Sequence, residues 1–413
     1  MLKHFLIVIA FFITGFSVAQ QGTTSPYSFF GIGNLKFKGT VENRSMGGIG
    51  VYSDSIHLNI QNPAGIAGLR LVNYSISGSH RSNTLSTSVE SQKATTTTLD
   101  YLAIGVPMGK FGASFGLIPY TATGYKLENI SGTTTTQYSG EGGLNKAFFT
   151  LGYQITPELS IGVDANYNFG NIENTTLSTQ ENIQLGTKEV NRSDLLGFSF
   201  NLGAQYKKMV SEKLEFMGSV TFTPETSFNS ENSRTLSTFL VLGNGNLADL
   251  DLRDVPVEDT DFTFPSQLTL GAGIGKPKNW FVGGEFSTQK TSNLTNRTFD
   301  LENVVFEDAS KFRIGGFYIP EYNSFSSYLK RIVYRGGFRF EETGLTINNE
   351  AINEFGISFG LGLPMGRTFS NINLGFELGK RGTKNSGLVE ESFFNIFVSL
   401  SLNDKWFEKR LYD

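Results

Sequence analysis

The sequence predicts an all-β fold: a transmembrane antiparallel β-barrel of about 14 strands, preceded by an N-terminal hatch or plug segment. Three observations predict this fold. Apolar and polar residues alternate with a period of two along many segments, the connections between these segments alternate between short and long, and glycine and aromatic residues are abundant. The 413 residues include 47 glycines, 37 phenylalanines and 15 tyrosines, a composition that suits pleated strands and many turns.

The segment 159–169 shows the alternation most clearly. Its odd positions are apolar from Leu159 to Phe169, and its even positions from Ser160 to Asn168 are polar or glycine. Similar patterns occupy 196–207, 355–363 and 372–379. Tilted strands of this length cross a bilayer, with their apolar face toward lipid. A soluble sandwich, whose apolar faces pack on each other, would show the same pattern in any single strand.

The connections between strands distinguish these two folds. We expect strands near 72–80, 98–106, 111–120, 143–154, 158–170, 194–207, 213–224, 262–275, 279–289, 308–318, 331–341, 352–363, 369–381 and 391–402. Short connections such as 156–158 and 276–278 alternate with long polar ones such as 121–142, 171–193 and 225–261. Short periplasmic turns and long external loops are typical of outer-membrane barrels, so we predict an even strand number and a location in the outer membrane.

The first nineteen residues resemble a secretory signal peptide. Lys3 and His4 precede an apolar run over 5–18, and Ser17 and Ala19 supply small residues for a cleavage site after Ala19. An uncleaved N-terminal anchor is the alternative. The predicted organisation is therefore a signal peptide over 1–19, a hatch or plug over 20–70 and an outer-membrane barrel over 71–413. The lumen of 14 strands is too wide for wall side chains alone to fill, so either it is a water channel or another segment fills it. We assign residues 20–70 to this interior.

Composition also excludes several classes of function. The absence of cysteine excludes disulfides, thiolate metal sites and a cysteine nucleophile, and the net charge of −4 indicates no nucleic-acid surface. His57 and His80 lack the partners of a catalytic triad or a metal site, although Ser79 lies beside His80. We therefore expect no enzyme, no metal and no cofactor.

Two motifs carry a family resemblance. Ser45-Met46-Gly47-Gly48-Ile49-Gly50-Val51 is followed by Asp54 and then by Asn62-Pro63-Ala64-Gly65. Together with the strand number, they resemble the hatch of FadL-type outer-membrane transporters of long-chain fatty acids and other hydrophobic compounds. That resemblance implies passive uptake, with outer-membrane lipid and a hydrophobic small molecule as the partners of the protein.

A second resemblance modifies the first. The stretches 25–33 and 403–407 resemble a Bacteroidetes branch of FadL-like proteins, which includes accessory barrels of type IX secretion. The alternative function is therefore a barrel that binds a partner barrel of a secretion or surface-assembly system and has no ligand of its own.

A proline marks the place where the resemblance implies a gate. Pro119 cannot donate to a sheet ladder, so it indicates a bulge, an edge or a kink in the third strand, or simply the end of the strand. In FadL-type proteins an inward kink of this strand opens the wall laterally. The candidate ligand and gating residues are Asn62, Pro63, Ala64, Gly65, Phe115, Pro119 and Tyr120, although 62–65 also fits an ordinary turn.

Charged residues on the polar faces of the strands form the last candidate site. Charge on the lipid face costs roughly 2–4 kcal/mol at the bilayer midplane, so these side chains should point inward. They are Arg331, Arg335, Arg339, Lys311, Arg313, Glu285, Glu354 and Glu377. We interpret them as an ion-pair network that holds the plug, or as arginines that bind a carboxylate or phosphate head group.

Overall fold

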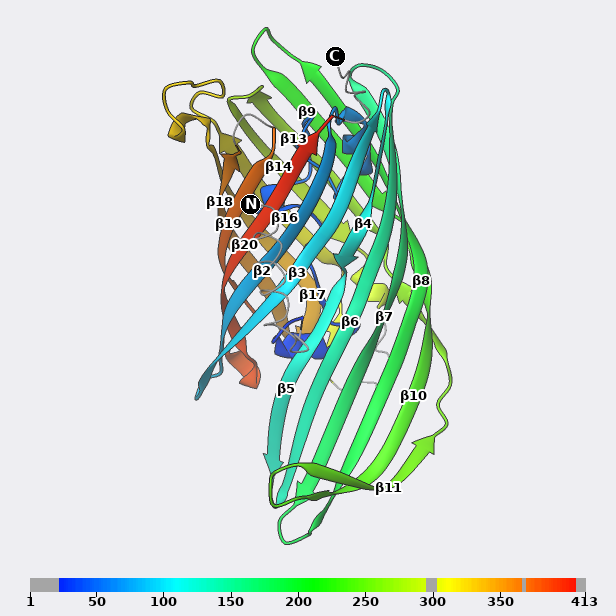
Figure 1. Cartoon of the computed structure of the whole chain (residues 1–413). Helices are drawn as coiled ribbons and strands as arrows, with labels where there is room; N and C mark the ends of the chain where they lie inside the picture. The colour runs from blue at the N-terminus through cyan, green and yellow to red at the C-terminus, as the bar shows by residue number, and fades with distance from the viewer. Residues whose placement is uncertain (1–21, 295–302, 366–368, 406–413) are drawn as a thin grey trace, which may run out of the picture.

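The computed structural model describes residues 22–294, 303–365 and 369–405, and it is a closed antiparallel barrel of 14 wall strands (Figure 1). In order around the wall, these are β2 (Val72–Ser86), β3 (Ser91–Met108), β4 with β5 (Phe111–Pro119 and Thr121–Ser131), β6 (Thr134–Gln154), β7 (Leu159–Gln180), β8 (Leu185–Met209), β9 with β10 (Glu215–Thr223 and Thr226–Val241), β12 with β13 (Thr260–Phe264 and Gln267–Lys276), β14 (Trp280–Gln289), β16 (Ala309–Tyr318), β17 (Val333–Ile347), β18 (Glu350–Pro364), β19 (Asn371–Arg381) and β20 (Glu390–Asp404). The ladder between β20 and β2 closes the ring, from Val72 opposite Asp404 to Ser86 opposite Glu390. The predicted fold class is confirmed.

The long polar connections over 121–142, 171–193 and 225–261 were predicted incorrectly as loops. Residues 171–180 and 185–193 continue β7 and β8, and 121–131 and 134–142 form a hairpin of β5 with β6. Beyond the wall, β11 (Leu247–Val255) pairs with β10, and β15 (Val304–Phe306) pairs with β17. These extensions escaped prediction because their sequences are mostly polar on both faces, so the alternation of apolar and polar residues is lost while the strand continues.

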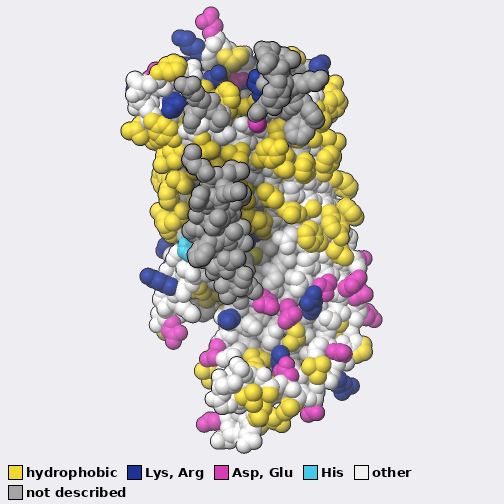
Figure 2. Space-filling model, in the orientation of Figure 1, with side chains coloured by type: hydrophobic (Ala, Val, Ile, Leu, Met, Phe, Trp, Pro, Cys, Tyr) yellow, Lys and Arg dark blue, Asp and Glu magenta, His cyan; other side chains and the backbone are white. Residues whose placement is uncertain are grey.

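The two faces of the wall strands have opposite character. On β8, Phe198, Phe200 and Leu202 are 64%, 46% and 48% exposed, whereas Ser199 and Asn201 between them are 4% and 5% exposed. On the face of the barrel that it shows, Figure 2 presents the apolar side chains as a broad band over the half nearest the short turns, with charged residues beyond it at both ends. The apolar faces therefore look outward, and the barrel spans a membrane at this band.

The remaining elements are short. The structure contains the 3-10 helices η1 (Pro26–Phe29), η2 (Pro63–Gly68), η3 (Thr291–Asn293), η4 (Leu329–Arg331) and η5 (Asn385–Gly387), the helix α2 (Val41–Arg44) and the strand β1 (Asn34–Leu35). Within the described ranges, no helix is long and apolar enough to cross a bilayer. The proposed signal peptide lies outside the described residues.

Residues 22–71, called the N-terminal segment below, run inside the barrel toward its short-turn end (Figure 1). Their backbone touches wall strands at glycines on both sides of the lumen. A Cβ built at any of these glycines would overlap a residue of the N-terminal segment, namely Ser45, Met46, Gly47, Asn62, Pro63 or Ile66. The wall glycines concerned are Gly112, Gly152, Gly162, Gly203, Gly315, Gly337, Gly360 and Gly375. Many wall glycines are thus sites where a strand must leave room for a second backbone.

Candidate functional site

The third wall strand departs from the barrel surface part of the way along its length. Its first half, β4, pairs with β3 only from Met108 opposite Phe111 to Leu102 opposite Leu117. Its second half, β5, pairs with β6 on one side and, on the other, with β1 inside the lumen rather than with β3. Among the described residues, the edge of β3 over 91–101 therefore has no partner on this side of the wall.

Pro119 and Asp100 lie where the two strands separate. Pro119 is the last residue of β4, and the next backbone N–H, that of Tyr120, donates to Leu144 of β6 at 2.7 Å. Because neighbouring N–H groups of a strand point to opposite sides, the missing donor of Pro119 falls on the unpaired side toward β3. Asp100 is the extra residue of a bulge in β3, since Gly78 pairs with Leu99 and Ser77 with Tyr101.

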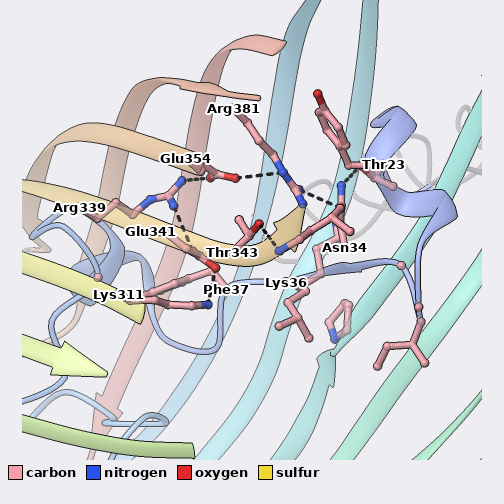
Figure 3. Close-up of a pocket in the computed structure, with 18 of the residues that line it drawn as sticks. Thr23, Asn34, Lys36, Phe37, Lys311, Arg339, Glu341, Thr343, Glu354 and Arg381 are labelled. Atoms are coloured by element: carbon pink, nitrogen blue, oxygen red, sulfur yellow. Dashed lines mark hydrogen bonds and ion pairs between the residues drawn. The ribbon is translucent and has the colours of Figure 1, made fainter. Parts of the chain in front are cut away.

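A cavity of about 240 Å³ lies behind this gap. Leu99 and Pro119 line it at the gap. Leu35 and Phe37 of the N-terminal segment and Arg339 of β17 line it as well. Figure 3 shows charged side chains from β16, β17, β18 and β19 converging on it. The break in the wall, the N-terminal segment and the predicted charge network therefore meet at one cavity.

Arg339 is the centre of the charge network. Its guanidinium pairs with Glu354 and, through Nε, with Glu377 at 2.6 Å. Glu377 is 2% exposed and also binds Arg44 of the N-terminal segment at 3.3 Å. The Arg44 guanidinium lies 3.7 Å from the ring centroid of Phe397, at the same wall. The network thus joins the N-terminal segment to the wall, as the ion-pair interpretation expected.

Four more of the predicted charges contribute to this inner wall in different ways. Lys311 pairs with Glu341 at 2.7 Å. Arg313 pairs with Glu285 at 3.2 Å, and together they clasp the N-terminal segment, since Gly50 N–H donates to Glu285 at 2.8 Å and Arg313 donates to the Gly48 carbonyl at 3.2 Å. Arg335 binds the amide oxygen of Asn373 at 3.0 Å instead of a carboxylate.

Two predicted site residues lie elsewhere. Arg331 belongs to η4, before β17 begins, and contacts the ring of Tyr328 at the short-turn end, so it is not part of the wall strand. Phe115 is 47% exposed and lies between the inward-facing Ser114 and Gly116, so it faces lipid and does not line the lumen. The apolar alternation of β4 already assigns it to the outer face.

The Asn62–Gly65 bend packs against the wall on the opposite side of the lumen. The Asn62 side chain accepts from Ala64 N–H at 3.0 Å and donates to the Ala204 carbonyl of β8 at 3.3 Å. Pro63 follows it as the first residue of η2, and Ala64 is fully buried. A Cβ at Gly162 or Gly203 would overlap this bend, so the motif is a docking element of the N-terminal segment.

A larger hollow of about 980 Å³ lies at the short-turn end. Asp54 and His57 line it and form an ion pair of 2.7 Å. Burial works against both charges, but the His57 imidazolium and the N–H groups of Ile56 and His57 hold the pKa of Asp54 well below its usual range. Burial by itself would lower the pKa of His57, but the Asp54 carboxylate raises this pKa above 6.5.

Sequence reasoning missed Lys36, Lys146 and the glycines of the wall. Lys146 stands among apolar inward-facing residues of β6 and is 6% exposed. Its parity, inward together with Leu144 and Phe148, was the signal that could have identified it. Which glycines face a second backbone cannot be read from the spacing of glycines along a strand.

Comparisons with known proteins agree with this architecture. A family model described as BamG matches residues 1–413. The Ralstonia pickettii toluene transporter TbuX superimposes with a TM-score of 0.62 at 14% identity, over 89% of this chain and 99% of that one. The Pseudomonas putida toluene transporter TodX gives 0.60 at 15% identity, over 90% and 100%. A Pseudomonas aeruginosa FadL homologue gives 0.57 at 9% identity, over 90% and 98%. No curated protein matches the sequence.

Proposed function

The chain belongs to the BamG family, and from its geometry we propose that it is an outer-membrane barrel for passive uptake of hydrophobic compounds, with lateral exit beside the third strand. The observation that carries this proposal is the unpaired edge of β3 over 91–101 in front of the cavity that Leu99 and Pro119 border. An interruption at this place gives a solute a route between the lumen and the lipid that surrounds the apolar band. The barrels named as toluene transporters share the fold.

The packing of the N-terminal segment favours a lateral route over an axial one. The backbone of this segment lies against wall glycines on opposite sides of the lumen. Even one methyl group added at Gly162 or Gly337 would overlap the segment. A solute moving along the barrel axis would have to displace these contacts together with the buried Arg44–Glu377 pair. A solute that leaves through the gap beside β3 does not have to break any of these contacts.

An uptake assay with liposomes that contain the purified barrel tests the proposal. It measures the uptake of a fluorescent long-chain fatty acid and of a labelled neutral hydrocarbon. Thr98→Trp places a large ring at the cavity wall beside the gap and should lower uptake of both compounds at least tenfold. Pro119→Ala returns a backbone donor to the unpaired edge and should lower uptake by a smaller factor. Pro107→Ala, in the paired part of β3 opposite Gly112, is the matched control and should leave uptake unchanged. Equal uptake by Thr98→Trp and the parent protein would refute lateral exit.

A partner-binding barrel is the second candidate function, and one observation favours it. The hollow at the short-turn end is bordered by the apolar side chains of Phe325, fully exposed, and Phe369, 55% exposed. Exposed apolar side chains at the mouth of a hollow are typical of protein contacts. Photo-crosslinking from position 325 in native membranes should yield one defined adduct with another envelope protein if this function holds. Monomeric protein alone would reject it.

A further inference from the structure

Asp100 lies on the lumen face of the wall, directly behind the lateral gap. Asp100 and Tyr101 both turn inward, whereas Leu99 and Leu102 on either side of them are 54% and 45% exposed on the outer face. A bulge places two successive side chains on one face of a strand, and here it directs the Asp100 carboxylate into the cavity behind the gap. A solute that leaves this cavity between β3 and Pro119 must therefore pass a carboxylate.

Three hydroxyl groups hold the Asp100 carboxylate at this place. Ser79 donates to it at 2.7 Å, Ser77 at 3.3 Å and Thr98 at 3.4 Å. Among the described residues, no lysine, arginine or histidine nitrogen lies within 4.0 Å of the carboxylate. Neutral donors therefore fix its position, and its negative charge has no cation in direct contact.

Lys36 lies on the opposite side of the gap. Its backbone N–H donates to the carbonyl of Tyr120 at 2.9 Å, directly after Pro119, and its ammonium donates to the carbonyl of Gly22. In the part of the chain that the structure describes, no carboxylate lies within 4.0 Å of this ammonium. Burial lowers the pKa of Lys36 to about 8, and the Asp100 carboxylate is the strongest opposing influence. The two charges thus interact through the cavity without forming an ion pair.

The other charged side chains that line this cavity are matched. Each of them has an opposite charge within 4.0 Å, as in the pair of Arg81 with Glu391 at 3.6 Å. Within the described ranges, Asp100 and Lys36 are the exceptions. Of these two, Asp100 lies on the free edge of β3 itself, where a solute leaves the cavity. Its charge is therefore placed to act on whatever passes through the gap.

We propose that Asp100 is a specificity-determining residue of the lateral gap, which favours neutral and cationic hydrophobic compounds over anions such as fatty-acid carboxylates. A half-buried charge is screened by salt less than one on an open surface, so the repulsion of an anion persists at physiological ionic strength. Neutral rings and chains meet no such barrier. The inference rests on the proposed function and names the substrate class of that same route.

Uptake into liposomes that contain the full-length barrel tests the inference with probes that share one aromatic ring system. These are pyrenemethanol, which is neutral, pyrenesulfonate, a permanent anion, and pyrenemethyltrimethylammonium, a permanent cation. The parent protein should take up pyrenesulfonate most slowly. Asp100→Asn should raise the uptake ratio of pyrenesulfonate to pyrenemethanol by about fourfold or more, because two like charges about 5 Å apart repel each other by this factor even in water. Lys36→Gln should lower the same ratio.

Glu141→Gln removes an exposed carboxylate from β6 and is the matched control, which should keep the parent ratio. An unchanged ratio in Asp100→Asn, or a rise in Lys36→Gln, would overturn the inference. Lys36 lies outside the wall strands, so its variant tests the charge balance even if Asp100→Asn does not assemble. Pyrenemethanol uptake no faster than in protein-free liposomes would refute the proposed function itself, whereas rapid uptake with an unchanged ratio would refute only the role of Asp100.

Discussion

The backbone nitrogen of Gly47 lies so close to Gly337 of β17 that a single Cβ on Gly337 would overlap it. Gly47 itself has φ of +69° and Gly48 has φ of +86°, in the left-handed region that favours glycine. The Gly47 N–H then donates to Ser358 of the neighbouring strand at 2.9 Å. The Gly-Gly motif and a wall glycine therefore form one contact between two backbones.

Gly337→Ala should loosen the N-terminal segment, because the added methyl group forces two backbones apart at a cost of about 1–3 kcal/mol. We expect a lower thermal midpoint in detergent and the appearance of ion conductance in planar bilayers. Gly336→Ala is the matched control, since its Cβ would meet nothing closer than 3.9 Å. Identical conductance and melting in the two variants would contradict the close packing.

Arg339→Met should destabilise the barrel by about 3–5 kcal/mol, because it leaves Glu354 and Glu377 as buried charges that have lost their main cation. Lys380→Met removes a cation from an exposed pair with Glu390 at 3.2 Å and should change stability by less than about 1 kcal/mol. Urea unfolding in lipid vesicles measures both variants. A loss in Arg339→Met no larger than that in Lys380→Met would show that the network contributes little.

The ion pair between Asp54 and His57 should make the N-terminal segment sensitive to pH. The pKa of His57 is raised above 6.5, so its contribution to stability is complete below 6.5 and is lost as pH rises through the folded value. The pKa of Asp54 is lowered below 3.8, so its contribution is present above 3.8 and is lost as pH falls through its folded value.

Hydrogen exchange measures this dependence at the N–H groups of Ile56 and His57, which donate to Asp54 at 2.9 and 2.8 Å. After correction for intrinsic rates, exchange should accelerate severalfold as pH rises above the folded pKa of His57. Asp54→Asn should remove most of the pH dependence. Asp249→Asn, in the surface pair with Lys188, should not affect it. A parent protein with pH-independent protection would exclude the pair as a stabilising contact.

Phe200→Arg should hinder insertion of the barrel, because it places a charge in the apolar band at a cost of roughly 2–4 kcal/mol. Leu252→Arg is the matched control. Leu252 is more exposed than Phe200, at 66% against 46%, but it lies on β11 beyond the wall, so this variant should fold normally. Folding yield into vesicles, measured by gel mobility without heating, checks the pair. Equal yields would contradict burial of the Phe200 face in lipid.

The sequence by itself determined the barrel, its strand number and the inward direction of charges such as Arg339, because these follow from the two-residue period and from the cost of charge in lipid. It also placed Pro119 at an interruption of the third strand, since proline lacks a ladder donor. Phe115 was misassigned although its parity was readable, because the expected function was given more weight than the alternation.

Only the tertiary structure decided which residues meet across the lumen. Gly47 and Gly337 are 290 positions apart, and nothing local in β17 requires a glycine at position 337. Lys36 and Lys146 are also far apart in the sequence. They line one cavity because β5 leaves β3 and pairs with β1 inside the barrel. Barrel closure and the path of the N-terminal segment set these distances, and neither leaves a periodic signal in the sequence.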